Sequence, residues 1–178
     1  FRWLDWLMTV NEQAGHQVQF YLIAARPAGP IDGCYDLDEP IIQRLMRDML
    51  SRGHRIGLHP SYTTYQDASQ MQKDREILTQ SVRQIEPSFE VVKVRQHFLR
   101  WSVFETARHQ QAAGFCSDST LGYADAPGFR TGVCYPYQMY DLERRQPLKI
   151  WQEPLVAMEV SVFGKEYLNV RNHKAALD

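Results

Sequence analysis

The chain has few cysteines, almost no net charge and no long apolar run, and each of these deficits excludes a class of protein. Its three cysteines (Cys34, Cys116 and Cys134) are an odd number at no metal-binding spacing, so they predict neither a disulfide framework nor a cysteine metal site. Lysine and arginine number 20 against 21 acidic residues, and the net charge of -1 predicts no nucleic-acid partner and no anionic membrane surface. No apolar stretch approaches the length of a transmembrane helix.

What the chain does have is enough apolar sequence for a single packed domain over residues 1–178. Of its 178 residues, 44% are hydrophobic and 12% aromatic, which suits one globular core and argues against disorder. The cysteine usage and the lack of a signal-type segment predict a reducing compartment and a cytoplasmic location. The chain opens on Phe1 inside an apparent helix, so we expect a fragment of a longer protein.

Apolar periodicity, acidic caps, glycines and prolines divide the chain into alternating helices and strands. Asp38 before Glu39 and Pro40 is typical of a helix start, with Asp38 as the cap, and Gly53 ends that helix. We expect helices over about 1–14, 41–52, 67–84 and 102–113, strands over about 18–24, 56–58, 91–94, 115–117, 148–151 and 155–162, and an aromatic loop over 121–141. This alternation predicts an α/β fold with a largely parallel sheet.

The stretch 53–61, GHRIGLHPS, places a histidine directly after a short buried strand. The apolar run before His59 is bounded by Gly53 and Pro60, which favours a strand of a parallel sheet. His59 then lies at the carboxyl end of that strand, where α/β folds carry their functional groups. A structural histidine that closes the strand is the competing interpretation.

Two further predicted strands also end in polar side chains. The β-branched run 91–94 leads into Arg95 and His97, and the strand 115–117 leads into Asp118. Because neighbouring parallel strands are about 5 Å apart, side chains at their ends can share one site. Asp118 either binds substrate hydroxyls or forms a turn, and both interpretations stay open.

Taken in order, the segments GHRIGLHPS, RQHFLR, DSTLGYAD and GFRTG resemble the motifs of the polysaccharide deacetylases, the carbohydrate esterases of family four with a NodB-homology domain. The likeness spans nearly the whole chain and is greatest to a branch found among bacterial surface-polysaccharide genes. It implies a distorted (β/α)7-type barrel with parallel strands. The family's first strand, with the catalytic base, would precede Phe1, and its last strand, with the catalytic acid, would follow Asp178.

The resemblance implies a hydrolase that removes an acetyl group from a sugar with the help of a divalent metal, and zinc is the first choice. The family holds this metal with an aspartate and two histidines, of which the second lies one helical turn after the first. His59 matches the first histidine, but Thr63 stands at the position of the second. We therefore expect either that His97 shares the ion with His59 or that the metal has been lost. The alternative for His97 is a hydrogen bond to a carboxylate or to the substrate.

The resemblance also assigns roles outside the metal shell. Arg95 matches the family's motif arginine, which orients the catalytic aspartate, so we predict a catalytic role for Arg95. Tyr123, Asp125, Phe129 and Arg130 on the aromatic loop are predicted to line a carbohydrate groove, since rings stack on sugar faces and charged groups bind hydroxyls. Packing within the loop is the competing interpretation for each of these residues.

Two functions from different classes follow from these residues. The first is a metal-dependent deacetylase that cleaves an amide or ester bond of an acetylated sugar or polysaccharide. The second is a deacetylase-like domain that has lost catalysis and binds carbohydrate, an interpretation that Thr63 supports. A third possibility, a metal-free hydrolase of C–N bonds in cyclic amides, has no direct support in the sequence.

Overall fold

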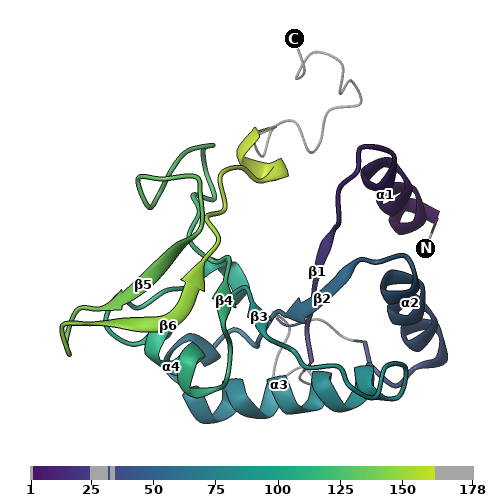
Figure 1. The fold of residues 1–178 in the computed structure, drawn as a ribbon, viewed down its shortest axis with the longest axis horizontal. Helices are drawn as coiled ribbons and strands as arrows, with labels where there is room; N and C mark the ends of the chain where they lie inside the picture. Colours follow the sequence, from purple (N-terminus) through teal and green to yellow (C-terminus); the bar gives the residue numbers. More distant parts are fainter. Residues whose placement is uncertain (1, 25–31, 33–34, 163–178) are drawn as a thin grey trace.

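The computed structural model of the chain describes residues 2–24, 32 and 35–162. It contains one six-stranded sheet in the order β1-β2-β3-β4-β6-β5 (Figure 1). Neighbouring strands are parallel except β5 and β6, which form an antiparallel hairpin at one edge. The strands are β1 (Gln19–Leu22), β2 (Arg55–Leu58), β3 (Lys93–Val94), β4 (Ser117–Asp118), β5 (Tyr137–Asp141) and β6 (Gln146–Gln152). The predicted α/β class with a mostly parallel sheet is confirmed, and closure of the sheet into a barrel stays a prediction.

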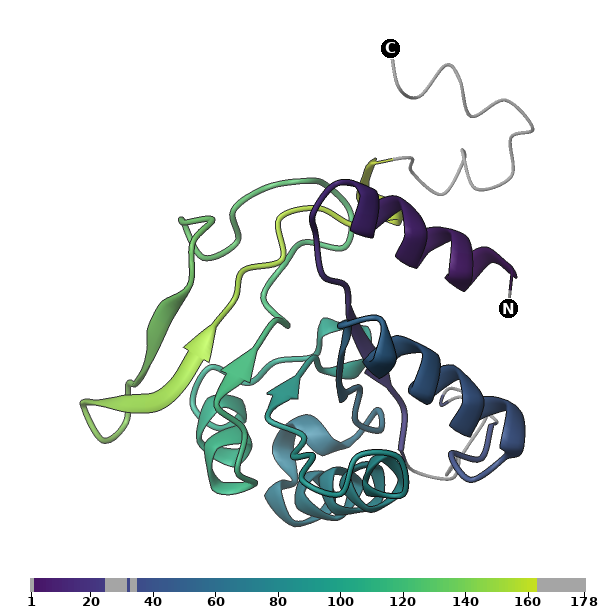
Figure 2. The ribbon, with the colours of Figure 1, turned by 45° about the vertical axis from the view of Figure 1, so that its right-hand side comes forward.

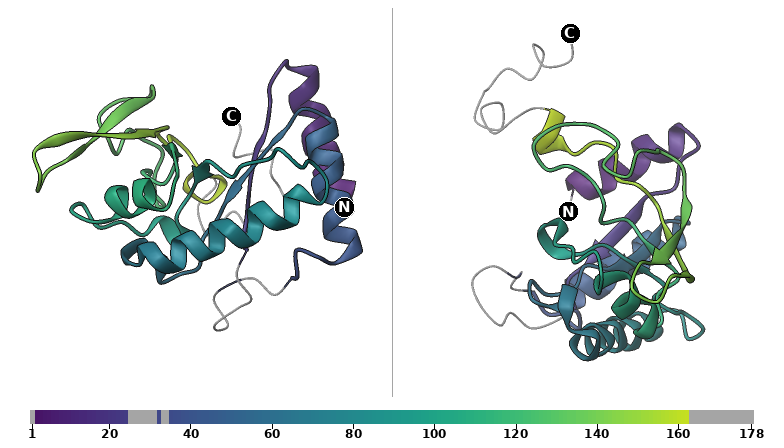
Figure 3. Two further views of the ribbon diagram at one scale, coloured as in Figure 1. Left: turned by 60° about the horizontal axis from the view of Figure 1, so that its bottom comes forward. Right: turned by 90° about the vertical axis from the view of Figure 1, so that its left-hand side faces the viewer.

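The helices of the described part lie mainly against one face of this sheet. They are α1 (Arg2–Gln13), α2 (Pro40–Ser51), α3 (Ala68–Arg83) and α4 (Thr106–Ala112), with short 3-10 helices η1 (Thr64–Gln66) and η2 (His97–Leu99). Helix α1 lies beside α2 (Figure 2). Helix α3 contacts both α2 and α4 and lies between them (Figure 3).

The strands alternate in polarity, and this alternation decides which face of the sheet is buried. Ile56, Leu58 and Val94 belong to the hydrophobic core beneath the helices, and Phe20, the register partner of Ile56, packs against this core. The opposite face carries the residues between them and their register partners, which are mostly polar or small: Tyr21, Gly57, Lys93, Ser117 and Trp151.

The start of α2 differs from the prediction in one respect. Pro40 begins the helix as expected, but the N-cap residue is Glu39, and its side chain makes no capping hydrogen bond. Asp38 instead accepts hydrogen bonds from Ser81 Oγ and from Gln84 Nε2, each at 3.2 Å. The expected cap is therefore wrong, because the Asp38 carboxylate contacts α3 and not the α2 backbone.

Helix α4 begins one turn later than expected, at Thr106. The predicted capping box joined Ser102 to Glu105, and these side chains do bond, with Ser102 Oγ 3.1 Å from Glu105 Oε2. The backbone N–H of Ser102, however, donates to Thr106 Oγ1 at 2.8 Å. This contact closes a turn ahead of the helix, so the sequence signal marks the approach to α4 and not its first residue.

The region from residue 121 to residue 162 differs most from the prediction. The expected loop contains strand β5, whose Met139 is buried, and β5 pairs with β6. The expected strand over 155–162 is wrong, because residues 153–158 have no regular structure and residues 159–162 are helical. This segment is held by the aromatic loop instead: the N–H of Leu155 donates to the Leu121 carbonyl, and the N–H of Gly128 donates to the Val156 carbonyl.

Two further features of the described residues concern membrane-spanning helices and the cysteine thiols. No helix among the described residues is long and apolar enough to cross a membrane. Cys116 and Cys134 are exposed free thiols, and Cys34 lies outside the described residues.

Leu58, the last residue of β2, is fully buried, so Leu58→Ala is expected to lower the free energy of unfolding by about 3 kcal/mol. The matched control is Leu142→Ala, since Leu142 is 53% exposed and its loss should change stability by less than about 0.5 kcal/mol. Urea denaturation followed by circular dichroism measures both values. Equal losses in the two variants would contradict the buried position of β2.

Candidate functional site

The residues that directly follow β2, β3, β4 and β6 form a row along the carboxyl edge of the sheet. They are His59, Arg95, Ser119 and Glu153. The backbone N–H of each donates to a carbonyl oxygen of a neighbouring strand, at 2.7 to 3.0 Å. The parallel register therefore brings together two of the predicted site residues, His59 and Arg95, and adds Ser119 and Glu153 beside them.

His59 is neutral and has a defined tautomer. Its Nδ1 lies 2.6 Å from the carbonyl oxygen of Arg95, and because a carbonyl can only accept, Nδ1 carries the proton. Burial lowers the pKa of His59 to about 4, so the imidazole is uncharged at neutral pH. Its Nε2 then carries a lone pair that can bind a metal ion or accept a proton.

His97 lies next to His59, with 4.8 Å between the ring centroids. Its Nδ1 lies 2.8 Å from Asp32 Oδ1, and the His97 and Asp32 side chains are only 11% and 7% exposed. The same Asp32 oxygen accepts the backbone N–H of Tyr62 at 3.0 Å. Of the alternatives left open for His97, the hydrogen bond to a carboxylate is therefore present, and it leaves Nε2 for a further ligand.

Asp32 is a site residue that the sequence analysis missed. It lies in the proline- and glycine-rich stretch between β1 and α2, which has no periodic pattern. A single aspartate in such a stretch gives no signal of its own, because its partners His97 and Tyr62 are distant in the sequence.

The orientation of the two imidazoles fits that of metal-binding histidines. Such a histidine usually forms a hydrogen bond to an oxygen through one ring nitrogen and binds the metal through the other. A catalytic zinc usually has three protein ligands. The described residues contain no group of three or more histidine, cysteine, aspartate or glutamate side chains that could hold a metal. Thr63 is exposed and precedes η1. His59 and His97 thus fit two places in a metal shell, and a complete shell needs a third ligand from outside the described residues.

The guanidinium of Arg95 is held on two sides. Its Nε donates to the Ser119 carbonyl oxygen at 3.2 Å and to Ser119 Oγ at 3.0 Å. Its central carbon lies 4.6 Å from the centroid of the Tyr21 ring, which is the geometry of a cation–π contact. Nη1 and Nη2 have no hydrogen-bond partner among the described residues, so the guanidinium can still bind a carboxylate in a bidentate manner.

A cavity of about 310 Å³ opens beside His59 and Arg95, and its other lining residues are Gln96, Phe98, Leu99, Leu155, Ala157, Met158 and Glu159. Phe98 is 67% exposed, and its ring lies 4.8 Å from that of His97. Phe98 and Leu99 have φ angles of 54° and 52°, a left-handed conformation that is uncommon for residues other than glycine. Such strained backbone is concentrated at functional sites.

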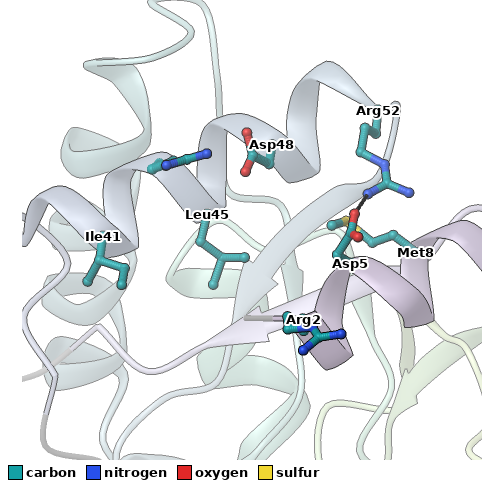
Figure 4. Close-up of a pocket in the computed structure, with 8 residues that line it drawn as sticks. Arg2, Asp5, Met8, Ile41, Leu45, Asp48 and Arg52 are labelled. Atoms are coloured by element: carbon teal, nitrogen blue, oxygen red, sulfur yellow. Dashed lines mark hydrogen bonds and ion pairs between the residues drawn. The ribbon is translucent and has the colours of Figure 1, made fainter.

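A larger hollow of about 550 Å³ lies between α1 and α2 (Figure 4) and shares no lining residue with the cavity at the strand ends. Arg52 borders this hollow and donates to Asp5, Thr9 and Glu12 of α1. These contacts join the two helices, so the charges around Arg52 serve the packing of α1.

The predicted carbohydrate-binding residues of the aromatic loop are mainly exposed. Tyr123 and Phe129 are 45% and 54% exposed, and Asp125 is exposed as well. Arg130 donates from Nη1 to the Gly122 carbonyl oxygen at 3.1 Å. Because the loop is hydrogen-bonded to Leu155 and Val156, it borders the segment that lines the His59 cavity.

Asp118 is fully buried and takes part in a tight hydrogen-bond network. Its oxygens accept from the N–H of Thr120 at 2.8 Å, from Thr120 Oγ1 at 2.5 Å and from Gln110 Nε2 at 2.6 Å. Burial raises the pKa of Asp118 to about 6 against these hydrogen bonds. Of the two interpretations that the sequence left open, this geometry favours the turn aspartate, which fixes the strand end where Ser119 lies.

No family model and no curated protein sequence matches the chain. Its structure matches a crystal structure described as a "putative polysaccharide deacetylase" from Mycobacterium smegmatis, with a TM-score of 0.56 and 14% sequence identity. The chain therefore shares the fold of that structure over the matched region. The match covers 84% of this chain and 44% of that chain. The resemblance seen in the motifs is confirmed for the fold, and the surface-polysaccharide branch stays a prediction.

The neutral state of His59 predicts a specific acid sensitivity. Its pKa is about 4 in the folded protein against an ordinary 6.5, so between these values the unfolded chain binds the extra proton. The stability of wild type should therefore fall, as the pH is lowered from 6.5 to 4, by roughly 3 kcal/mol more than that of His59→Gln. Urea denaturation at a series of pH values measures the difference.

The comparison of wild type with His59→Gln isolates this one group. The raised pKa values of Asp74 and Asp118 act in the opposite direction, but both proteins contain them. Identical pH profiles for the two proteins would show that His59 is not a buried neutral imidazole.

Proposed function

We propose that this chain belongs to a metal-dependent deacetylase that removes an acetyl group from a sugar or polysaccharide by hydrolysing an amide or ester bond. The observation that supports this most is the His59 and His97 pair, whose ring centroids are 4.8 Å apart and whose Nδ1 atoms are both bound to oxygen. The pair lies at the carboxyl ends of parallel strands, where α/β enzymes carry their chemistry. The fold alone would not support an activity.

In this proposal His59 and His97 supply two ligands of a divalent metal, with zinc as the first choice. A bound ion of this kind polarises the acyl carbonyl and lowers the pKa of a bound water. His59 is already neutral at neutral pH, so it needs to lose no proton to act as a ligand. Asp32 holds the ring of His97 in one orientation, as an outer carboxylate does for a metal-binding histidine.

Arg95 has the proposed role of orienting a catalytic carboxylate through Nη1 and Nη2, which have no hydrogen-bond partner among the described residues. In this proposal the role of Arg95 is to position that carboxylate and not to transfer a proton itself, since a guanidinium stays protonated at neutral pH.

The proposed substrate is a carbohydrate that enters the cavity beside His59. Phe98 presents an exposed ring at this cavity, and aromatic rings stack on the apolar faces of sugars. The proposed extension of this surface consists of Tyr123, Asp125, Phe129 and Arg130, because their loop is hydrogen-bonded to Leu155, which lines the cavity. We propose that this enzyme is cytoplasmic and acts in the synthesis of a surface polysaccharide.

A second candidate function is carbohydrate binding without catalysis. Two observations favour it: an exposed Thr63 at the position of the family's second histidine, and the lack of a third metal-binding side chain among the described residues. In this case the cavity and the aromatic loop bind the sugar, and His59 and Arg95 serve only to hold the strand ends.

Zinc binding to the natural full-length chain separates these candidates. We expect stoichiometric zinc by elemental analysis, and an affinity at least tenfold weaker in His59→Gln and in His97→Gln by titration calorimetry. The exposed His16 provides the matched control, and His16→Gln should bind zinc as wild type does.

Acetate release from a panel of N- and O-acetylated sugars completes this test. Release that requires zinc and His59 would support the deacetylase. Binding of the same sugars without zinc and without acetate release would contradict it and support the second candidate.

The Asp32 contact generates a separate prediction. Asp32→Asn keeps the size of the side chain but removes the charge that holds His97, so the zinc affinity should fall about tenfold to a hundredfold. Asp125→Asn, at an exposed aspartate of the aromatic loop, is the matched control for zinc binding. Unchanged zinc affinity in Asp32→Asn would mean that His97 is not a ligand.

A further inference from the structure

Tyr21 reaches across the sheet from β1 toward the end of β4. Its hydroxyl oxygen accepts a hydrogen bond from Ser119 Oγ at 2.7 Å, and Ser119 directly follows β4. Strands β2 and β3 lie between β1 and β4 in the sheet. Burial raises the pKa of the Tyr21 hydroxyl to about 12, so it stays protonated at neutral pH. A side chain can cross neighbouring strands in this way only if those strands leave room for it.

Gly57 on β2 provides that room. It pairs in register with Tyr21, and a Cβ atom at Gly57 would lie 2.9 Å from Tyr21 Cε1. The same atom would lie 2.9 Å from Gln19 Nε2 and 3.0 Å from the backbone oxygen of Lys93. Cβ contacts shorter than 3.0 Å are essentially never seen in proteins, so a larger residue at position 57 would displace both the tyrosine ring and the Gln19 amide.

The ring that lies over Gly57 supports the guanidinium of Arg95. The guanidinium carbon is 4.6 Å from the ring centroid, and Arg95 Nε donates to the same Ser119 Oγ that donates to Tyr21. The side chains of Tyr21, Arg95 and Ser119 therefore contact one another in all three pairs. Arg95 contacts the Tyr21 ring and the Ser119 hydroxyl, and the Ser119 hydroxyl donates to the Tyr21 hydroxyl. Nη1 and Nη2 remain for a ligand, and Arg95 lines the cavity beside His59.

We propose that Tyr21 is a positioning residue that fixes the guanidinium of Arg95 toward the His59 cavity, and that Gly57 is required because the Tyr21 ring lies over it. The catalytic consequence rests on the proposed function, since Arg95 is there the residue that orients the catalytic carboxylate. The structural consequence, an immobilised guanidinium, does not depend on any activity.

Two substitutions at position 21 separate the ring from the hydroxyl. Tyr21→Phe keeps the ring beneath Arg95, and Tyr21→Leu removes both contacts. The side-chain Nε–H signal of Arg95, assigned in a nitrogen-15 NMR spectrum by its loss in Arg95→Lys, reports directly on the guanidinium. In wild type we expect this signal to be shifted upfield by the ring and to exchange slowly with water.

The upfield shift should persist in Tyr21→Phe and disappear in Tyr21→Leu, with exchange at least tenfold faster in Tyr21→Leu. The matched control is Tyr140→Leu, because Tyr140 lies on β5 and is 51% exposed.

In acetate release, kcat should fall roughly tenfold in Tyr21→Leu and less in Tyr21→Phe, with KM nearly unchanged in both. A purely structural role would lower the amount of active protein without producing this order.

Gly57→Ala is a second way to separate the Tyr21 ring from the Arg95 guanidinium, because it displaces the ring while Tyr21 remains. It should remove the upfield shift of Arg95 Nε–H as Tyr21→Leu does. This variant decides the question if Tyr21→Leu does not fold.

The NMR spectrum tests the positioning role of Tyr21, and acetate release tests the proposed function, so the two proposals can fail separately. A wild-type Arg95 Nε–H signal that a folded Tyr21→Leu or Gly57→Ala leaves unchanged would overturn the positioning role. The expected NMR changes in a protein that releases no acetate from any sugar would support the positioning role and overturn the proposed function.

Discussion

The parallel register of β1 to β4 is the constraint on which the rest of the structure depends. It sends Leu58 and Val94 into the core beneath the helices, and by the same alternation it sets His59 and Arg95 on the other side, at the strand ends. A slip of one residue in β2 would reverse this arrangement, turning His59 toward the helices and Leu58 toward the candidate site. The hydrophobic core and the candidate site are therefore specified by the same backbone hydrogen bonds.

The fold could be predicted where the signals are local. The run that ends in His59 is bounded by Gly53 and Pro60, and the corresponding strand lies where it was expected. Strand β5 was missed because Tyr137–Asp141 follows a stretch rich in glycine and proline, and its strand character depends on pairing with β6. The wrong strand over 155–162 has the opposite cause, because the backbone of this apolar run forms hydrogen bonds with the aromatic loop and not with a strand.

The candidate site divides in the same way. His59 and Arg95 could be found because each ends an apolar or β-branched run. Asp32 and Tyr21 could not, since an aspartate in a loop and a tyrosine inside a strand acquire their roles only through partners far along the chain. The order of motifs was informative beyond any single residue, because it predicted a fold that 14% sequence identity alone would hardly reveal.

Phe98 and Leu99 set two requirements of the protein against each other. Their left-handed backbone costs of order 1 kcal/mol or more at each residue, whereas glycine or asparagine would adopt it at little cost. Selection for thermal stability alone would therefore replace the aromatic ring at position 98. The proposed binding of a carbohydrate would favour keeping the ring, because the exposed ring forms a wall of the cavity beside His59. At position 98, a substitution that relaxes the backbone would therefore remove part of the cavity wall, so stability and the shape of this cavity cannot both be improved there.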